Sequence, residues 1–163
     1  EALRLIGKYL VTSVEEPENL EARGGMLVGS CLAGISFLKG LGFVHAISHM
    51  VGAEYDTQHG LTNAIVLPVV LRCNLPSLDE KRNNMADALG MSDKTSDGFI
   101  GEIEAKLDRL NIPKSLSEIG VPFECASRIS EKAMLDSAAS TNPVRGDVAL
   151  VKELVEQSIK KAR

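Results

Sequence analysis

Apolar residues recur at intervals of three and four positions along most of this 163-residue chain. This spacing places them on one face of an α-helix, so it predicts amphipathic helices that pack against a core. The last such segment follows Asp147, a residue type that caps helix N-termini well. The pattern predicts helices over residues 2–14, 20–38, 59–71, 78–89, 99–110 and 122–135, one around His45 that ends at Gly52, and a final one after Asp147.

Alternation of polar and apolar residues, the pattern of a half-buried strand, is not convincing anywhere in the chain. The run AIVLPVVL at residues 64–71 has strand propensity, but Pro68 in its middle argues against a central strand. We therefore predict an all-α fold, in which about seven to nine helices form a single bundle-like domain over residues 1–163.

Small residues follow one stripe of the predicted helix at residues 20–38, for which Asn19 is the expected N-cap. Gly25, Gly29 and Ala33 are spaced four apart, so a neighbouring backbone can approach closely along them. Each glycine inside a helix costs up to about 1 kcal/mol relative to alanine, which favours a packing role for the stripe. We predict that it brings the helix around His45 close.

Composition and charge exclude several classes of protein. The hydrophobic fraction of 44% and the charged fraction of 25% are ordinary for a globular domain. A net charge of −4 argues against a nucleic-acid-binding surface, which needs clustered Lys and Arg. The longest uncharged run covers residues 24–38, which is shorter than the roughly 20 residues of a membrane span, so we predict no membrane association.

The three cysteines, Cys31, Cys73 and Cys125, are far apart in the sequence and form no CxxC pair. Neither a thiolate zinc site nor a disulfide framework is indicated, and we expect a reducing, cytoplasmic environment. Cys31 lies in an apolar run, so we expect its thiol to be buried. The sequence shows no signal peptide and starts with Glu1 inside a helical pattern, so we also expect a truncated chain.

The chain has three histidines, His45, His49 and His59, and they lie close together in the sequence. The first two are four residues apart, which places both imidazoles on one face of a helix. His59 would begin the next helix, capped by Asp56 or Thr57, and a tight connection could swing it back toward His45. Divalent first-row metals bind imidazole nitrogens at about 2.0–2.1 Å and usually take three or four protein ligands. Converging histidines would supply part of such a ligand set.

The alternative to a metal site is that the three histidines are ordinary polar residues on packed helices. HAISH lacks the Glu of HExxH, which excludes a zinc peptidase.

The residues around these histidines form a long pattern. It reads G-x-x-H-A-x-x-H, then G-x-x-Y-D-x-x-H-G-x-x-N-A-I-x-L-P, and it resembles the signature of the iron-containing (group III) alcohol dehydrogenases. The resemblance is strong over about residues 20–74 and weaker afterwards. The residues that carry it are Gly42, His45, Ala46, His49, Gly52, Tyr55, Asp56, His59, Gly60, Asn63, Ala64, Ile65, Leu67 and Pro68, preceded by Leu20, Glu21, Ala22 and Arg23 and followed by Asn142, Pro143 and Arg145.

The resemblance implies a fold and a set of site residues. The implied fold is the C-terminal metal-binding domain of the dehydroquinate synthase-like and iron-containing alcohol dehydrogenase fold. In this family one Asp and three His hold the metal, and two of these His fall on His45 and His59. His49 falls on a histidine beside the substrate and the nicotinamide, which implies a catalytic role, with packing alone as the alternative. Phe37 falls on a residue that lines the substrate cleft, although the spacing to His45 is one residue shorter here, and a plain core Phe is the alternative.

The resemblance also implies parts that these residues lack. The family takes its other two metal ligands from an Asp-x-x-x-His segment, and it binds the nucleotide in a domain with a Gly-rich loop; neither motif occurs here. The implied cofactors are Fe²⁺ or Zn²⁺, with two ligands missing from this chain, and NAD or NADP, bound mainly by the absent domain. The implied partners are a small alcohol or aldehyde substrate and a second copy in a homodimer.

Two functions remain open at this point. The first is the C-terminal part of a metal-dependent, NAD(P)-linked alcohol dehydrogenase that transfers hydride between an alcohol or aldehyde and nicotinamide, and is inactive as this fragment. The second is a free-standing, non-catalytic helical binding domain derived from that family. Glycerol dehydrogenase and dehydroquinate synthase share the domain layout, but the pattern around His45 and His59 favours the alcohol dehydrogenases.

Overall fold

The computed structural model describes the whole chain, residues 1–163, and its regular elements are all helices. The prediction of an all-α fold is confirmed. The backbone contacts divide the chain into two compact units. The first consists of Glu1–Lys39 and Leu78–Leu110, and the second of Gly40–Ser77 and Asn111–Arg163. Each unit therefore combines two separate stretches of sequence. A single domain over residues 1–163 stays a prediction.

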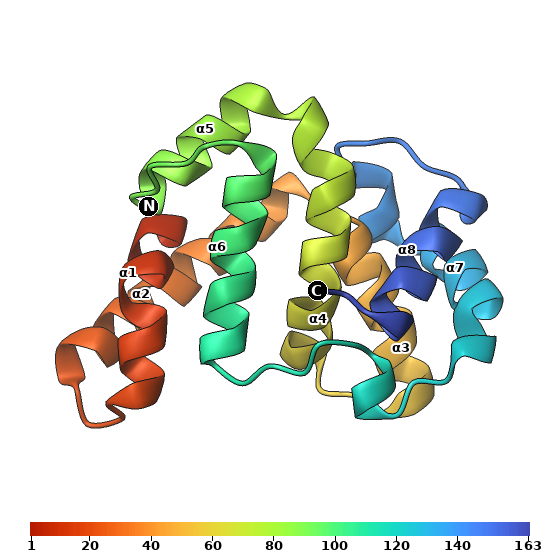
Figure 1. Ribbon diagram of the computed structural model, residues 1–163, viewed down its shortest axis with the longest axis horizontal. Helices are drawn as coiled ribbons and strands as arrows, with labels where there is room; N and C mark the ends of the chain where they lie inside the picture. The colour runs from red at the N-terminus through yellow and green to blue at the C-terminus, as the bar shows by residue number, and fades with distance from the viewer. The chain divides into compact units, whose positions relative to one another are not determined.

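The first unit contains four α-helices and one 3₁₀ turn. They are α1 (Ala2–Glu15), α2 (Leu20–Ser36), η1 (Phe37–Lys39), α5 (Asp79–Ala88) and α6 (Ser96–Arg109). Helices α1 and α2 pack side by side and are joined by the short connection at residues 16–19 (Figure 1). Asn19 caps α2 as predicted, because its side chain accepts a hydrogen bond from the Ala22 N–H at 3.0 Å.

Helix α1 packs on the small residues of α2. A β-carbon at Gly25 would lie 2.1 Å from Tyr9 Cδ2, and one at Gly29 would lie 3.0 Å from Ile6 Cγ1. The prediction that the histidine-bearing helix uses this stripe is wrong, because α1 occupies it. Cys31 lies two positions beyond Gly29, which turns it to the opposite side of the helix. Its thiol is exposed, so the expectation of a buried Cys31 is also wrong.

The second unit contains the other four α-helices. They are α3 (Phe43–Tyr55), α4 (His59–Asn74), α7 (Ala126–Leu135) and α8 (Val148–Lys160), with 3₁₀ turns η2 (Leu75–Ser77), η3 (Ser117–Ile119), η4 (Phe123–Cys125) and η5 (Ser137–Thr141). Helix α3 packs on α4 and α7, and α8 packs on the same two helices (Figure 1). The four helices therefore close on themselves around a common core.

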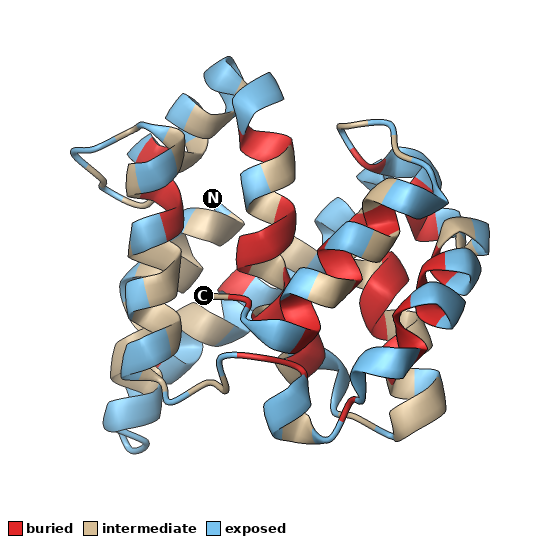
Figure 2. Cartoon of the chain, turned by 45° about the vertical axis from the view of Figure 1, so that its right-hand side comes forward, coloured by how far each residue is buried: buried red, intermediate tan, exposed pale blue.

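The large hydrophobic core of the chain lies in this second unit. All four of its helices contribute fully buried side chains, among them Phe43, Ile65, Ile129 and Val151. In Figure 2 the buried residues form red stripes along the facing sides of these helices. In the first unit, by contrast, α1 buries no residue completely, and Leu20 and Leu27 of α2 are largely exposed. The second unit thus has the better packed interior.

Several helix boundaries differ from those predicted. Helix α3 passes through Gly52 and ends at Tyr55. Helix α6 starts before Phe99, because the Thr95 hydroxyl caps it by accepting from the Gly98 N–H at 3.0 Å. A 3₁₀ turn separates the proline at position 122 from α7, which was predicted to start there. The Thr95 cap and the left-handed Asp56 after α3 are local features that hydrophobic spacing does not reveal.

The cap by Asp147 and the helical position of Pro68 are found as expected. The Asp147 side chain caps α8 by accepting from the Leu150 N–H at 2.9 Å. Pro68 lies inside α4, which continues to Asn74. No single helix is both long enough and apolar enough to cross a membrane.

Candidate metal and catalytic site

A tight turn between α3 and α4 organises the histidine region. Asp56 ends α3 in the left-handed conformation, with φ 52° and ψ 35°. Gln58 is the N-cap of α4, because its Oε1 accepts from the Leu61 N–H at 2.5 Å. The sequence-based assignment of this cap to Asp56 or Thr57 is wrong, since Asp56 closes the preceding helix instead.

This turn brings the three imidazoles together in the second unit. His45 and His49 lie one turn apart on α3, and His59 is the first residue of α4. The ring centroids of His45 and His59 are 5.3 Å apart, those of His49 and His59 are 5.4 Å apart, and those of His45 and His49 are 5.8 Å apart. The rings of His49 and His59 are stacked, with an interplanar angle of 17°. The expected convergence is observed, whereas the roles of the three residues remain predictions.

Asn63 marks the point toward which two of the rings are directed. Its amide Nδ2 lies 3.0 Å from His59 Nε2 and 3.4 Å from His45 Nε2. An amide nitrogen only donates, so both Nε2 atoms are acceptors and each ring carries its proton on Nδ1. In that tautomer the lone pair needed for metal binding is on Nε2. The Asn63 Oδ1 atom is buried and has no hydrogen-bond partner, so the site has an unsatisfied polar atom as well.

These donors fit part of a divalent metal site. Imidazole is a suitable ligand for both Fe²⁺ and Zn²⁺, and the Nε2 atoms of His45 and His59 share one neighbouring atom. No group of three or more His, Cys, Asp or Glu in this chain is arranged to hold a metal ion. A complete site needs three or four protein ligands. The two imidazoles alone are too few for a complete site, and their role as ligands remains a prediction.

The electrostatic surroundings of His45 favour its neutral form. Burial lowers the pKa of His45 below its ordinary value of 6.5, and the neighbouring His59 and His49 lower it further. Metal binding requires the neutral form of an imidazole, because a protonated nitrogen has no lone pair to offer. The surroundings of His45 therefore keep it in the form that a metal ligand needs.

Asp136 is a site residue that sequence analysis missed. It immediately precedes η5, and its Oδ2 lies 3.0 Å from His49 Nδ1. Burial alone would raise the pKa of the Asp136 carboxyl, but hydrogen bonds from the Ala138 N–H and from the His49 ring hold that pKa below its usual range. No local pattern marks this carboxylate, because the contact joins residues 87 positions apart.

Phe37, the residue implied to line the substrate cleft, belongs to the first unit. It begins η1, directly after α2, and it is 55% exposed. The alternative of a plain core Phe is therefore wrong. A role for Phe37 toward a substrate remains a prediction.

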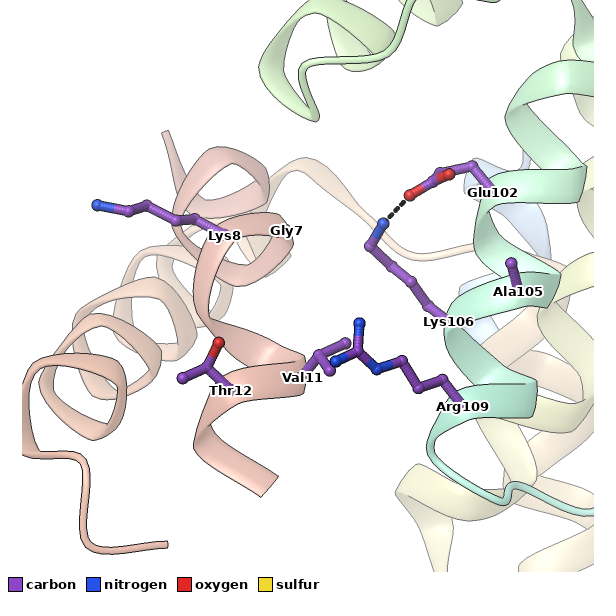
Figure 3. Close-up of a pocket in the computed structure, with 8 residues that line it drawn as sticks. All are labelled: Gly7, Lys8, Val11, Thr12, Glu102, Ala105, Lys106 and Arg109. Atoms are coloured by element: carbon purple, nitrogen blue, oxygen red, sulfur yellow. Dashed lines mark hydrogen bonds and ion pairs between the residues drawn. The ribbon is translucent and has the colours of Figure 1, made fainter. Parts of the chain in front are cut away.

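A hollow of about 310 Å³ lies within the first unit, between α1 and α6 (Figure 3). Two cations on its α6 side are already paired, Lys106 with Glu102 and Arg109 with Glu15. Lys8 on α1 points away from the hollow. Its walls contain no histidine or cysteine. The hollow therefore offers no chemistry comparable to that of the histidine cluster.

Comparison with known proteins decides the family. Residues 1–159 match the family model described as "Fe-containing alcohol dehydrogenase family, C-terminal". The chain belongs to the iron-containing alcohol dehydrogenases. Its match is to the C-terminal part of the family, and the fold expected from the resemblance is confirmed.

Several of the similar proteins have names that state an enzymatic activity. The 1,3-propanediol dehydrogenase of Citrobacter freundii is 34% identical over 168 residues, which covers 97% of this chain and 43% of that protein. Alcohol dehydrogenase 4 of Saccharomyces cerevisiae is 34% identical, with 97% of this chain and 41% of that protein covered. The NAD-dependent methanol dehydrogenase of Bacillus methanolicus is 31% identical, with 98% and 44% covered.

Solved structures give the same result. A 1,3-propanediol oxidoreductase superposes with a TM-score of 0.93 at 33% identity, over 97% of this chain and 43% of that one. An alcohol dehydrogenase from Oenococcus oeni superposes with a TM-score of 0.90 at 29% identity, over 96% and 43%. The chain thus spans less than half the length of these relatives.

Proposed function

We propose that this chain is the metal-holding helical part of a NAD(P)-linked, metal-dependent alcohol dehydrogenase. One observation carries the proposal: the Nε2 atoms of His45 and His59 both lie within 3.4 Å of Asn63 Nδ2 and both accept from it. In the proposed role the two imidazoles bind Fe²⁺ or Zn²⁺ through Nε2 and keep their protons on Nδ1.

His49 is the proposed catalytic residue. Its ring stacks on that of His59, so a group bound near the metal ligands lies close to it. It could orient the nicotinamide or hold the proton that leaves the alcohol hydroxyl. Packing alone is the alternative role. The two are distinguished by a His49→Gln variant of an enzyme that includes the nucleotide-binding domain, which keeps its metal in either case but loses turnover only if His49 is catalytic.

The bound metal would polarise the alcohol oxygen, and the nicotinamide would accept the hydride. The relatives are more than twice as long as this chain, since it covers 41–44% of their length. We propose that the two other metal ligands and the nucleotide site come from the part of the enzyme outside the matched region. The 163 residues alone should then turn over no substrate.

We further propose a small alcohol or its aldehyde as the substrate, because relatives are named for 1,3-propanediol and methanol. NAD and NADP both stay open as the nucleotide. The three cysteines are free thiols, which supports a reducing, cytoplasmic location. A homodimer stays part of the proposal on family resemblance alone.

Titration of the 163-residue chain with Zn²⁺ in a calorimeter tests the metal site. Two imidazoles make a weak site, so we expect a dissociation constant in the micromolar range or weaker. His45→Ala and His59→Ala should each abolish the binding heat, whereas His49→Ala should retain it. Submicromolar binding by the unmodified chain, or binding that survives both ligand variants, would contradict the proposal and favour a non-catalytic binding domain.

The catalytic half of the proposal needs an enzyme that includes the nucleotide-binding domain. His45→Ala in that enzyme should remove both the bound metal and the turnover of alcohol. Unchanged metal content together with unchanged turnover would rule out His45 as a ligand.

A further inference from the structure

The carboxylate of Asp136 is held in a fixed orientation against the histidine cluster. Its Oδ1 accepts from the Ala138 N–H at 2.8 Å, which caps η5, and its Oδ2 lies 3.0 Å from His49 Nδ1. Only 15% of the Asp136 side chain is exposed, against 35% for His49. Each carboxylate oxygen therefore has one protein partner, and the backbone of η5 decides which oxygen faces the imidazole.

This contact dictates the tautomer of His49. An ionised carboxylate can only accept a hydrogen bond, so the proton of a neutral His49 ring must be on Nδ1. The other nitrogen, Nε2, then carries a lone pair and can accept a hydrogen bond. The ring itself is held between His59, on which it stacks, and His45, which it meets edge-on at an angle of 69°.

We infer that Asp136 is the positioning residue of His49, holding it as the Nδ1–H tautomer so that Nε2 can accept a hydrogen bond from a hydroxyl group bound at the cluster. The inference builds on the proposed function, since that function supplies the hydroxyl compound. It concerns this chain's own residues, however, and can be tested with neither metal nor substrate present.

Substitution of Asp136 by Asn makes the sharpest test, because it preserves the shape of the side chain. The Ala138 N–H still requires an acceptor, so the amide oxygen should take the place of Oδ1. The amide NH₂ then faces His49 Nδ1, which must become the acceptor, and the ring proton should move to Nε2. Asp136→Asn should therefore invert the tautomer of His49 without removing the cap of η5.

The measurement is a long-range proton–nitrogen correlation spectrum of the histidine rings, at a pH above 8 and with a chelator present. The chain has three histidines, so a His49→Gln variant assigns the His49 signals. In the unmodified chain we expect a protonated Nδ1 and an unprotonated Nε2 for His49, and in Asp136→Asn the reverse. Asp147→Asn is the matched control, because Asp147 also caps a helix of this unit but is not bonded to a histidine in this structure; it should leave the His49 signals unchanged.

Two results would overturn the inference: a protonated Nε2 on His49 in the unmodified chain, or the same His49 tautomer in Asp136→Asn as in the unmodified chain. Either result would leave the zinc titration unaffected. Conversely, a failed zinc titration with the expected tautomers would count against the proposed function and not against the pairing of Asp136 with His49.

Discussion

Asn74 and Asn142 bind each other by two reciprocal side-chain hydrogen bonds, although 68 positions separate them in the sequence. Asn74 Nδ2 donates to Asn142 Oδ1 at 3.0 Å, and Asn142 Nδ2 donates to Asn74 Oδ1 at 2.9 Å. The same Asn142 side chain accepts from the Phe43 N–H at 3.1 Å and donates to the Val144 carbonyl at 2.8 Å. It therefore ties the start of α3 to the end of α4, the two helices that carry the histidines.

Substitution of Asn142 by Ala should lower the free energy of unfolding by about 3 kcal/mol. Both asparagines are at least 91% buried, so the variant leaves the Asn74 amide and the Phe43 N–H without these partners in the buried interior. Urea denaturation followed by circular dichroism measures the loss. Asn83→Ala, at an exposed position on α5, should change stability by less than about 0.5 kcal/mol. A loss in Asn142→Ala as small as that of the control would contradict the structural role.

Gly24 and Gly25 are adjacent on α2 but should respond oppositely to replacement by alanine. A β-carbon at Gly24 meets nothing within 4 Å, whereas one at Gly25 would overlap the Tyr9 ring. Gly24→Ala should stabilise the chain by roughly 0.5–1 kcal/mol through helix propensity alone. Gly25→Ala should destabilise it by roughly 1–3 kcal/mol, because α1 has to shift. Thermal denaturation of the two variants and of the unmodified chain measures these changes in stability. Equal stabilisation by both variants would show that α1 does not pack on this stripe.

Glu54 should contribute stability that depends on pH. Its carboxylate accepts from Arg128 Nε at 2.9 Å and from Lys132 Nζ at 2.7 Å, and these bonds lower its pKa below the ordinary value of 4.5. The unfolded chain then takes up this proton at a higher pH than the folded chain does. The stabilisation is therefore complete above about pH 5 and is lost as the pH falls through the folded pKa.

A Glu54→Gln variant isolates this contribution from those of other carboxylates. At pH 7 it should be about 1 kcal/mol less stable than the unmodified chain, and the difference should shrink as the pH falls below the ordinary Glu pKa of 4.5 and through the lowered pKa of folded Glu54. Glu131→Gln, an exposed change of the same charge on α7, should show no such trend. A difference that stays constant between pH 7 and pH 3 would refute a role for the ionised carboxylate.

Features that depend on residues close in sequence were predictable, whereas contacts between distant segments were not. The caps by Asn19 and Asp147, and the convergence of His45 with His59, depend on residues close in sequence, and all were predictable. The stripe at Gly25 and Gly29 predicted close packing correctly, but it could not say which helix would come close, because any helix with a suitable face can use it.

The features that escaped prediction are contacts between distant segments. Asp136 meets His49 only because α7 packs on α3, and Asn142 meets Asn74 only after the second unit has formed. Neither residue lies in a helical pattern or a metal-binding spacing, so no local rule selects it. Asn63 is different, because its position four residues after His59 places it on the same face of α4, and the spacing could have identified it.

Asn63→Asp should convert the two-histidine arrangement into a tighter metal site. The substitution keeps the side-chain shape and puts a carboxylate oxygen where Nδ2 now lies, within 3.4 Å of the Nε2 atoms of His45 and His59. It adds a third ligand and a negative charge, so the affinity of the chain for Zn²⁺ should rise by about tenfold or more, or about 1.4 kcal/mol.

Calorimetry on this variant and on the unmodified chain measures the gain in Zn²⁺ affinity. Asn83→Asp adds the same charge on exposed α5 and should leave the affinity unchanged, and combining Asn63→Asp with His45→Ala should remove the gain. Should Asn63→Asp bind Zn²⁺ no better than the unmodified chain, the two imidazoles do not converge on a metal position.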